Sequence, residues 1–194
     1  MTSKLFSPIA LRGIELPNRI VVSPMCQYSA TDGTMSDWHI MHLGQFAVGG
    51  AGLILVEATG VEPAGRISPG CTGLYSDENE AAMARVVAFC RRQGVARMGI
   101  QLGHAGRKAS MSVPWGQGGA VPPEQGGWQT VAPSALAFAP SYPMPAALDT
   151  EGRALVMQLV AEHRAGGGMV IAAVHGEGFA DSRVMDLSAL KAAA

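Results

Sequence analysis

Residues 53–58 read Leu-Ile-Leu-Val-Glu-Ala, an apolar run that meets a carboxylate only near its end. A strand with one face in water alternates polar and apolar residues, whereas a strand covered on both faces is apolar throughout. The run therefore predicts a buried strand of a parallel sheet. Three further runs have the same character: 20–25 (IVVSPM), 98–102 (MGIQL) and 169–174 (MVIAAV).

Helices are predicted between these strands, because each intervening segment has a capping residue at its start and glycine just after its end. They run from Ser36 to about Val48, from Ser76 or Asp77 to Gln93, and from Asp149 or Thr150 to Arg164. Alternating strands and helices favour the α/β class, as a (β/α)8 barrel or an open doubly wound sheet. About four parallel strands are too few to close a barrel.

Two short extended runs with a turn at Arg12-Gly13 are expected before the first buried strand. A long irregular stretch rich in glycine and proline is expected over about 103–146. Loops of that length inside a compact domain are usually functional.

Composition narrows the class of protein. Of 194 residues, 48% are apolar and 15% charged, which excludes a disordered chain and a coiled coil. The net charge of −1 comes without a basic block, so nucleic acid and anionic membrane are not expected partners. No apolar run reaches the length of a membrane span. Three cysteines without a CxxC pair favour a reducing compartment, and we expect a cytoplasmic protein.

Polar side chains follow the ends of three predicted strands, where (β/α) folds place their active sites. Cys26 and Tyr28 follow the first strand, Glu57-Ala58 ends the second, and Gln101 with the segment 103–108 ends the third. The Cys26–Tyr28 pair has a ligand-binding and a packing interpretation, and both stay open at this point.

Three histidines also have two interpretations. His39 and His42 stand three apart on a predicted helix, which is compatible with a metal site, although no third ligand is placed and a structural role is favoured. His104 and Arg107 either organise their loop or contact a ligand. No metal site is predicted.

Several blocks occur in the order of a known family: PNRIVVSPMCQYSA, SDWHIMHLGQFAVGGAGLILVEATGVEPAGRIS, IQLGHAGRK and APSALAF. Over about residues 3–146 the chain resembles the old yellow enzyme family, in its branch of bacterial ene-reductases with a cysteine near the flavin. The resemblance implies a (β/α)8 barrel that binds FMN. It also implies transfer of hydride from NAD(P)H through FMN to the C=C bond of α,β-unsaturated carbonyl compounds.

The same resemblance assigns roles to particular residues. Cys26 would approach the reactive edge of the flavin and tune its potential, and Tyr28 would contact the enone substrate; these two are the predicted catalytic residues. The flavin would be bound by Ser23, Pro24, Met25, Cys26, Ala58 and Gln101.

The resemblance breaks near the end of the chain. The family's fourth strand ends in His-x-x-His or His-x-x-Asn before Gly-Tyr, whereas the matching positions here are Val174, Glu177 and Phe179. The later half of the family, with its FMN phosphate loops, has no counterpart. We therefore expect a truncated protein, the N-terminal half of a barrel.

Residues 147–194 resemble the C-terminal end of an ABC-transporter ATPase of the haem-exporter type. The motifs are Ala147-Leu148-Asp149, a helix, and a strand followed by His175. The chain has no G-x-x-x-x-G-K-[ST] phosphate loop, so nucleotide binding is not expected. The sequence thus predicts an old-yellow-enzyme-like domain over 1–146 and a helix–strand tail over 147–194, with a fusion near 145–147 as the hypothesis.

Two hypotheses on function follow. The chain is either an FMN-dependent ene-reductase or a non-catalytic fragment or chimera that does not retain FMN. In either case the open strand edges of a half barrel invite pairing, so we expect a homo-oligomer or an aggregation-prone chain.

Overall fold

The computed structural model describes residues 3–148 and six isolated positions after them, 151, 154, 158, 161, 162 and 165. All six positions are helical; five lie within the expected helix and the sixth, 165, is one residue past its predicted end. Two compact units are present, Met1–Asp149 and Thr150–Ala194. The predicted fourth strand at 169–174, the departures from the family at 174–179 and most of the ATPase-like tail lie outside the described residues.

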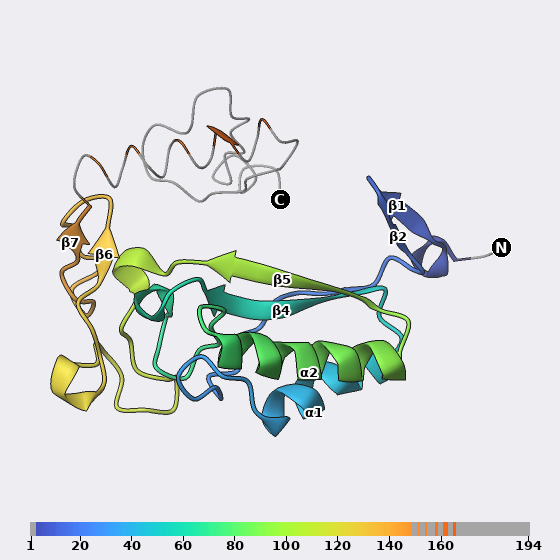
Figure 1. The fold of residues 1–194 in the computed structure, drawn as a ribbon, viewed down its shortest axis with the longest axis horizontal. Coiled ribbons are helices and arrows are strands. Elements are labelled where there is room, and N and C mark those ends of the chain that lie inside the picture. The colour runs from blue at the N-terminus through green and yellow to red at the C-terminus, as the bar shows by residue number, and fades with distance from the viewer. Residues whose placement is uncertain are drawn as a thin grey trace, which may run out of the picture. The chain divides into compact units, whose positions relative to one another are not determined.

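The main sheet has three parallel strands in the order β3-β4-β5; β4 and β5 lie side by side in Figure 1. The three strands are β3 (Val21–Val22), β4 (Leu53–Gly60) and β5 (Arg97–Gly103). Three of the predicted strands are confirmed, but β3 is shorter than the predicted 20–25, and the expected burial on both faces is wrong for β3 and β5, which have no buried residue. The ladder of β3 ends before Pro24, which has no backbone N–H to donate.

The remaining elements are small. β1 (Ile9–Leu11) and β2 (Ile14–Leu16) form the expected antiparallel hairpin, with Arg12 in the left-handed region at φ 52°. β6 (Val131–Ala132) and β7 (Ala146–Ala147) pair in parallel across the long loop region. Single turns of 3-10 helix complete the chain: η1 (Lys4–Phe6), η2 (Pro63–Gly65), η3 (Gly106–Lys108) and η4 (Pro123–Gln125).

Two helices lie together on one side of the sheet (Figure 1): α1 (Asp37–Val48) and α2 (Asp77–Gln93). Ser36 caps α1 by accepting from Trp38 N at 3.3 Å, and Ser76 caps α2 by accepting from Asn79 N at 3.2 Å, as predicted. Gly94 ends α2 against α1, since a Cβ there would overlap the Ala47 carbonyl. No helix within the described residues is long and apolar enough to cross a bilayer.

The core lies between these helices and the sheet. Ile54 and Val56 of β4 are almost fully buried against Val86 of α2 and Leu43 of α1. Side chains alternate across a strand, so the opposite face of the sheet carries Val21, Leu53, Leu55 and Gln101. These four, which we term the open face, are exposed or only half-buried. In a (β/α)8 barrel, where helices form the outer ring, this face lines the interior.

Replacement of Ile54 with alanine tests the core. Ile54 is 0% exposed, and removing a buried isoleucine side chain leaves a cavity, so Ile54→Ala should lower the free energy of unfolding by about 3 kcal/mol. Val48→Ala, at an exposed position at the end of α1, should change it by about 0.5 kcal/mol or less. Urea unfolding followed by circular dichroism measures both. Equal effects would contradict this assignment of the core.

The uncovered edge strand should promote self-association. Val21 is 49% exposed on β3, and a lysine on an edge strand opposes strand pairing. Val21→Lys should therefore shift the sedimentation velocity distribution toward the monomer, whereas Val48→Lys on α1 should leave it unchanged. A monodisperse wild-type monomer would remove the basis for this expectation.

Candidate active site

Three of the predicted site residues are neighbours at the carboxyl ends of the strands. Ala58 and Gln101 are partners in the β4–β5 ladder. The Cys26 sulfur accepts a hydrogen bond from the Ala58 backbone. Gln101 is exposed and Ala58 is half-buried. Cys26, Ala58 and Gln101 therefore lie close together, as expected for residues at the carboxyl ends of neighbouring parallel strands.

The other residues assigned to the flavin follow β3. Ser23 and Met25 are exposed and alternate with Val22, which packs against the core, so they continue the open face. Pro24 is half-buried between them. Their roles stay predictions.

A register shift in β4 turns Glu57 away from the open face. The shift lies between Val56 and Ala58, and it places the Glu57 side chain toward α1. Its Oε1 lies 3.3 Å from His39 Nε2, and the two side chains are 3% and 1% exposed. This contact has ion-pair distance without hydrogen-bond alignment, because His39 Nε2 has no aligned acceptor.

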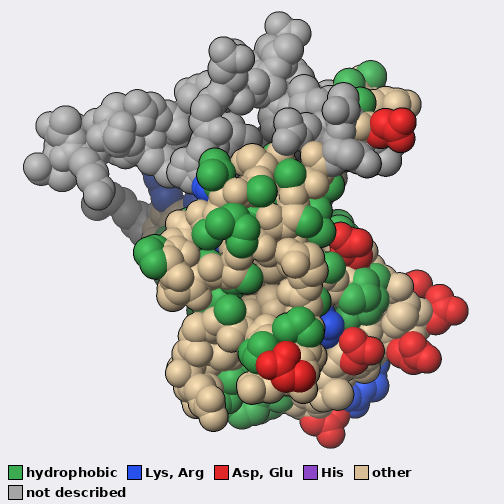
Figure 2. Space-filling model, turned by 90° about the vertical axis from the view of Figure 1, so that its left-hand side faces the viewer, with side chains coloured by type: hydrophobic (Ala, Val, Ile, Leu, Met, Phe, Trp, Pro, Cys, Tyr) green, Lys and Arg blue, Asp and Glu red, His purple; other side chains and the backbone are tan. Residues whose placement is uncertain are grey.

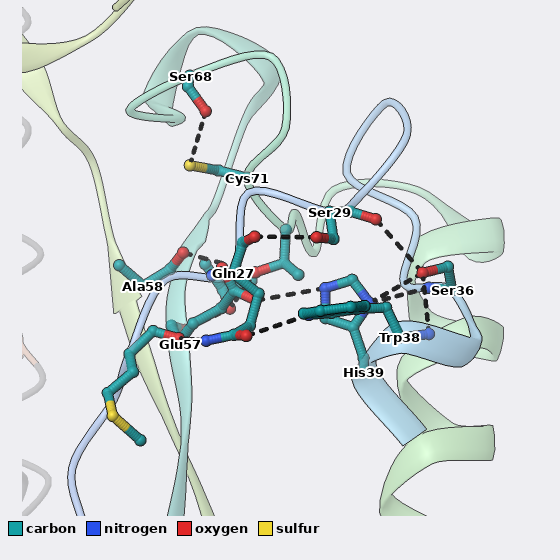
Figure 3. Close-up of polar contacts among 12 residues, drawn as sticks. Gln27, Ser29, Ser36, Trp38, His39, Glu57, Ala58, Ser68 and Cys71 are labelled. Atoms are coloured by element: carbon teal, nitrogen blue, oxygen red, sulfur yellow. Dashed lines mark hydrogen bonds and ion pairs between the residues drawn. The ribbon is translucent and has the colours of Figure 1, made fainter. Parts of the chain in front are cut away.

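The second oxygen of Glu57 holds the segment that carries the site (Figure 3). Gln27 N donates to Glu57 Oε2 at 3.0 Å, and Trp38 Nε1 donates to Gln27 Oε1 at 3.1 Å. Ser36 N donates to His39 Nδ1 at 3.0 Å, so the proton of a neutral His39 ring lies on Nε2, facing the carboxylate. We term Glu57, His39 and Gln27 the Glu57 clamp.

Two thiols interact beside the clamp. Cys26 is half-buried and Cys71 is fully buried. The hydrogen bond from Cys26 lowers the pKa of Cys71 to about 6, and Ser68 Oγ, 3.3 Å from Cys71 Sγ, helps to stabilise the thiolate (Figure 3). The same hydrogen bond and burial raise the pKa of Cys26.

Tyr28 is presented by a strained backbone. Its φ of 53° lies in the left-handed region, which tyrosine rarely enters. Ala30 N donates to Gly70 O at 2.9 Å, and a Cβ on Gly70 would stand 2.6 Å from the Tyr28 carbonyl oxygen, so glycine is needed at 70. Burial raises the pKa of the Tyr28 phenol, which therefore keeps its proton at neutral pH.

A cleft of about 310 Å³ opens beside Tyr28. Within the described part of the chain its only charged lining residue is Lys108, whose Nζ lies 4.2 Å from the centroid of the Phe138 ring. The remaining lining is aromatic, aliphatic or small: Tyr28, Ile67, Met111, Ser112, Val113, Pro114, Gly118, Gly119 and Tyr142. A cleft of this size and lining suits a small, mostly apolar ligand.

His39 and His104 have structural roles. The buried contact of His39 with Glu57 confirms the structural interpretation of that residue, and the described part of the chain contains no group of three metal ligands. His104 organises its loop, since its Nε2 lies 2.8 Å from Glu62 Oε1 and its Nδ1 accepts from Gly106 N at 3.0 Å.

The sequence missed two parts of the site. The sequence pattern places Glu57 only at the end of a strand. A carboxylate that closes an apolar strand needs a buried partner, and this requirement is a signal in the sequence for a contact such as that with His39. Cys71 was not singled out, and its spacing carries no such signal.

Parallel strands, helices on one face and a strand-end site define part of a β/α-barrel protein. Solved structures agree. Morphinone reductase in complex with tetrahydroNAD is 29% identical with a TM-score of 0.64, covering 86% of this chain and 47% of that one. The old yellow enzyme homologue from Zymomonas mobilis is 26% identical with a TM-score of 0.63, covering 80% and 42%. The chain thus matches roughly half of such a barrel, which the described residues do not close.

Residues 4–134 match the NADH:flavin oxidoreductase / NADH oxidase family, and the chain belongs to that family. It is 47% identical over 139 residues to NADH:flavin oxidoreductase FG08077 of Gibberella zeae, covering 70% of this chain and 33% of that protein. It is 44% identical over 147 residues to NADPH dehydrogenase of Geobacillus thermodenitrificans, covering 75% and 38%. The chain therefore spans between a third and two fifths of the length of these relatives. The ATPase-like tail stays a prediction.

Substitution at Glu57 tests the clamp. Glu57→Leu leaves the Gln27 backbone N–H without an acceptor, which costs about 1–3 kcal/mol, and removes the buried carboxylate that lies 3.3 Å from His39 Nε2. The free energy of unfolding should fall by about 3–5 kcal/mol. Glu57→Gln keeps one acceptor oxygen and should cost clearly less. Urea unfolding of both variants measures the difference, and a leucine variant as stable as the glutamine variant would contradict the clamp.

Proposed function

We propose that the chain is an FMN-dependent oxidoreductase that uses NAD(P)H to reduce the C=C bond of α,β-unsaturated carbonyl compounds. The observation that carries the proposal is the contact series from Cys26 through Ala58 to Gln101 at the strand ends. Family membership supports the flavin. The printed names of relatives, NADPH dehydrogenase and morphinone reductase with tetrahydroNAD, support a reduced nicotinamide as the donor.

The residues of the open face fit an isoalloxazine ring. Gln101 offers an amide with both a donor and an acceptor, which suits the pyrimidine edge of the ring. Gly99, two residues before Gln101 on β5, has no side chain, and Ala58 on β4 has only a methyl group. A flat ring can therefore approach the backbone of these strands closely. Leu53 and Leu55 supply apolar surface beneath it.

The residues around the ring would have separate roles. When bound, FMN supplies a carrier that accepts hydride from the nicotinamide and donates it to the alkene. Gln101 orients the pyrimidine edge, Cys26 sets the polarity at the opposite edge, and the protonated Tyr28 phenol donates a hydrogen bond on the substrate side. The strand-end region viewed in Figure 2 presents mostly hydrophobic and uncharged side chains, in keeping with a ligand of low charge.

Among the described residues, Lys108 is the one cation that lines this cleft. Its position suits an enone whose carbonyl oxygen gains negative charge during reduction. The phenol of Tyr28 and the ammonium of Lys108 would then share the stabilisation of that oxygen.

Titration with FMN tests the proposal. The purified chain should quench flavin fluorescence saturably at micromolar FMN, equivalent to about −8 kcal/mol. Gln101→Leu removes the amide and should weaken binding about tenfold, the effect of losing one or two hydrogen bonds. Gln45→Leu, at an exposed position on α1, is the matched control and should bind as the wild type does.

An activity assay with NADPH and cyclohexenone follows if FMN binds. Cys26→Ala should bind FMN with a changed visible spectrum and an altered rate of flavin reduction. Absence of saturable binding at high FMN would overturn the proposal. It would favour the alternative, a non-catalytic fragment or chimera that does not retain FMN.

A further inference from the structure

Cys71 reaches the site through backbone contacts on both sides of it. Before it, Gly70 O accepts from Ala30 N at 2.9 Å. After it, Thr72 Oγ1 donates to Ala58 O at 3.5 Å and lies 3.1 Å from Thr59 Oγ1. The loop carrying Cys71 is therefore fixed against both the β4 end and the segment after β3.

Cys26 is held from the other side by the same strand end. Its sulfur accepts from the Ala58 backbone, and Gln27 next to it is fixed by Glu57. The two thiols consequently meet next to Ala58 and share a hydrogen bond. A thiol pair in such contact needs only small side-chain rotations to reach bonding distance.

The pair loses one proton readily and the second with difficulty. The hydrogen bond lowers the pKa of Cys71 to about 6 and raises that of Cys26, so the two thiols titrate as a unit. At neutral pH the unit carries one negative charge in an S–H···S contact. Cys71 is 1% exposed, whereas Cys26 is half-buried, so Cys26 is the sulfur that a small reagent can reach.

We propose that Cys26 and Cys71 form a reversible internal disulfide when the protein meets a small-molecule disulfide such as oxidised glutathione. As the Cys26 proton passes to the Cys71 thiolate, the Cys26 sulfur attacks one glutathione sulfur, which forms a mixed disulfide and releases one glutathione as its thiolate. The Cys71 sulfur then attacks Cys26 Sγ and releases the second glutathione. From its singly charged state the pair loses one thiol proton and two electrons, and both electrons reduce the glutathione disulfide to one thiol and one thiolate.

This modification does not require flavin binding, so its test is independent of the test of the proposed function. If the chain also binds FMN, oxidation removes from the flavin edge the thiol that would tune it. The same residue would then serve as a cofactor contact and as a sensor of the thiol–disulfide balance.

Peptide mapping of the full chain tests the proposal. Trypsin separates the three cysteines, because cleavage after Arg19, Arg66, Arg85 and Arg91 places them in peptides 20–66, 67–85 and 86–91. The reduced protein is incubated with oxidised glutathione, alkylated with iodoacetamide, digested and analysed by mass spectrometry. Peptides 20–66 and 67–85 should appear joined and lighter by two hydrogens, while Cys90 stays alkylated. Dithiothreitol should restore all three thiols.

Variants separate the pair from ordinary thiol reactivity. Cys71→Ser should retain glutathione on Cys26, because no second thiol displaces it, and Cys71→Ala repeats this if the serine disturbs folding. Cys90 lies on α2 in the core, and the control variant Cys90→Ser should form the internal disulfide as the wild type does. In the wild type the rate of oxidation should rise through about pH 6. In Cys71→Ser it should rise only above the ordinary thiol pKa of about 8.5, because burial and the neighbouring Glu57 still raise the pKa of Cys26.

Two outcomes would overturn the proposal. One is a wild-type protein that keeps three free thiols under conditions in which glutathione modifies the Cys71→Ser variant. The other is a wild-type protein that retains glutathione on Cys26 as the Cys71→Ser variant does.

Discussion

A buried carboxylate organises the site. Glu57 is 3% exposed, and a charge or acid group at that depth is unfavourable unless its oxygens are bonded. One oxygen faces His39 at the start of α1, and the other accepts from Gln27 after β3. A single side chain thus joins the end of β4, the first turn of α1 and the segment carrying Cys26 and Tyr28. The Cys26 contact with Ala58 depends on this arrangement.

The elements that the sequence predicts well are those with local causes. The caps at Ser36 and Ser76 and the glycine stops place both helices within a residue, because capping depends on neighbouring positions. Apolar runs identify β4 and β5, because a series of apolar residues is a local pattern, although only the helix-facing side of this sheet is covered in the described residues. The same rule overestimates β3, since the pairing of that strand ends where Pro24 removes a donor.

The residues of the site also fall into two groups, those with a local sequence signal and those without one. Ala58 and Gln101 are predictable as strand ends, and the ladder places them opposite each other. Cys71 is not predictable in this way. Its neighbours Gly70 and Thr72 make contacts with residues distant in the sequence, and such contacts leave no periodic pattern. The roles toward flavin and substrate come from the family resemblance and stay proposals. The fourth predicted strand and the ATPase-like tail lie beyond the described residues.

The left-handed backbone at Tyr28 has a consequence for how such a site diversifies. Glycine, asparagine and aspartate enter that conformation most easily, and β-branched residues least. The range of side chains at position 28 is therefore narrowed by the main chain before any ligand selects among them. Met111 and Val113 line the same cleft without positive φ. We therefore expect that ligand preference changes more readily through substitutions at Met111 and Val113 than through substitution of Tyr28.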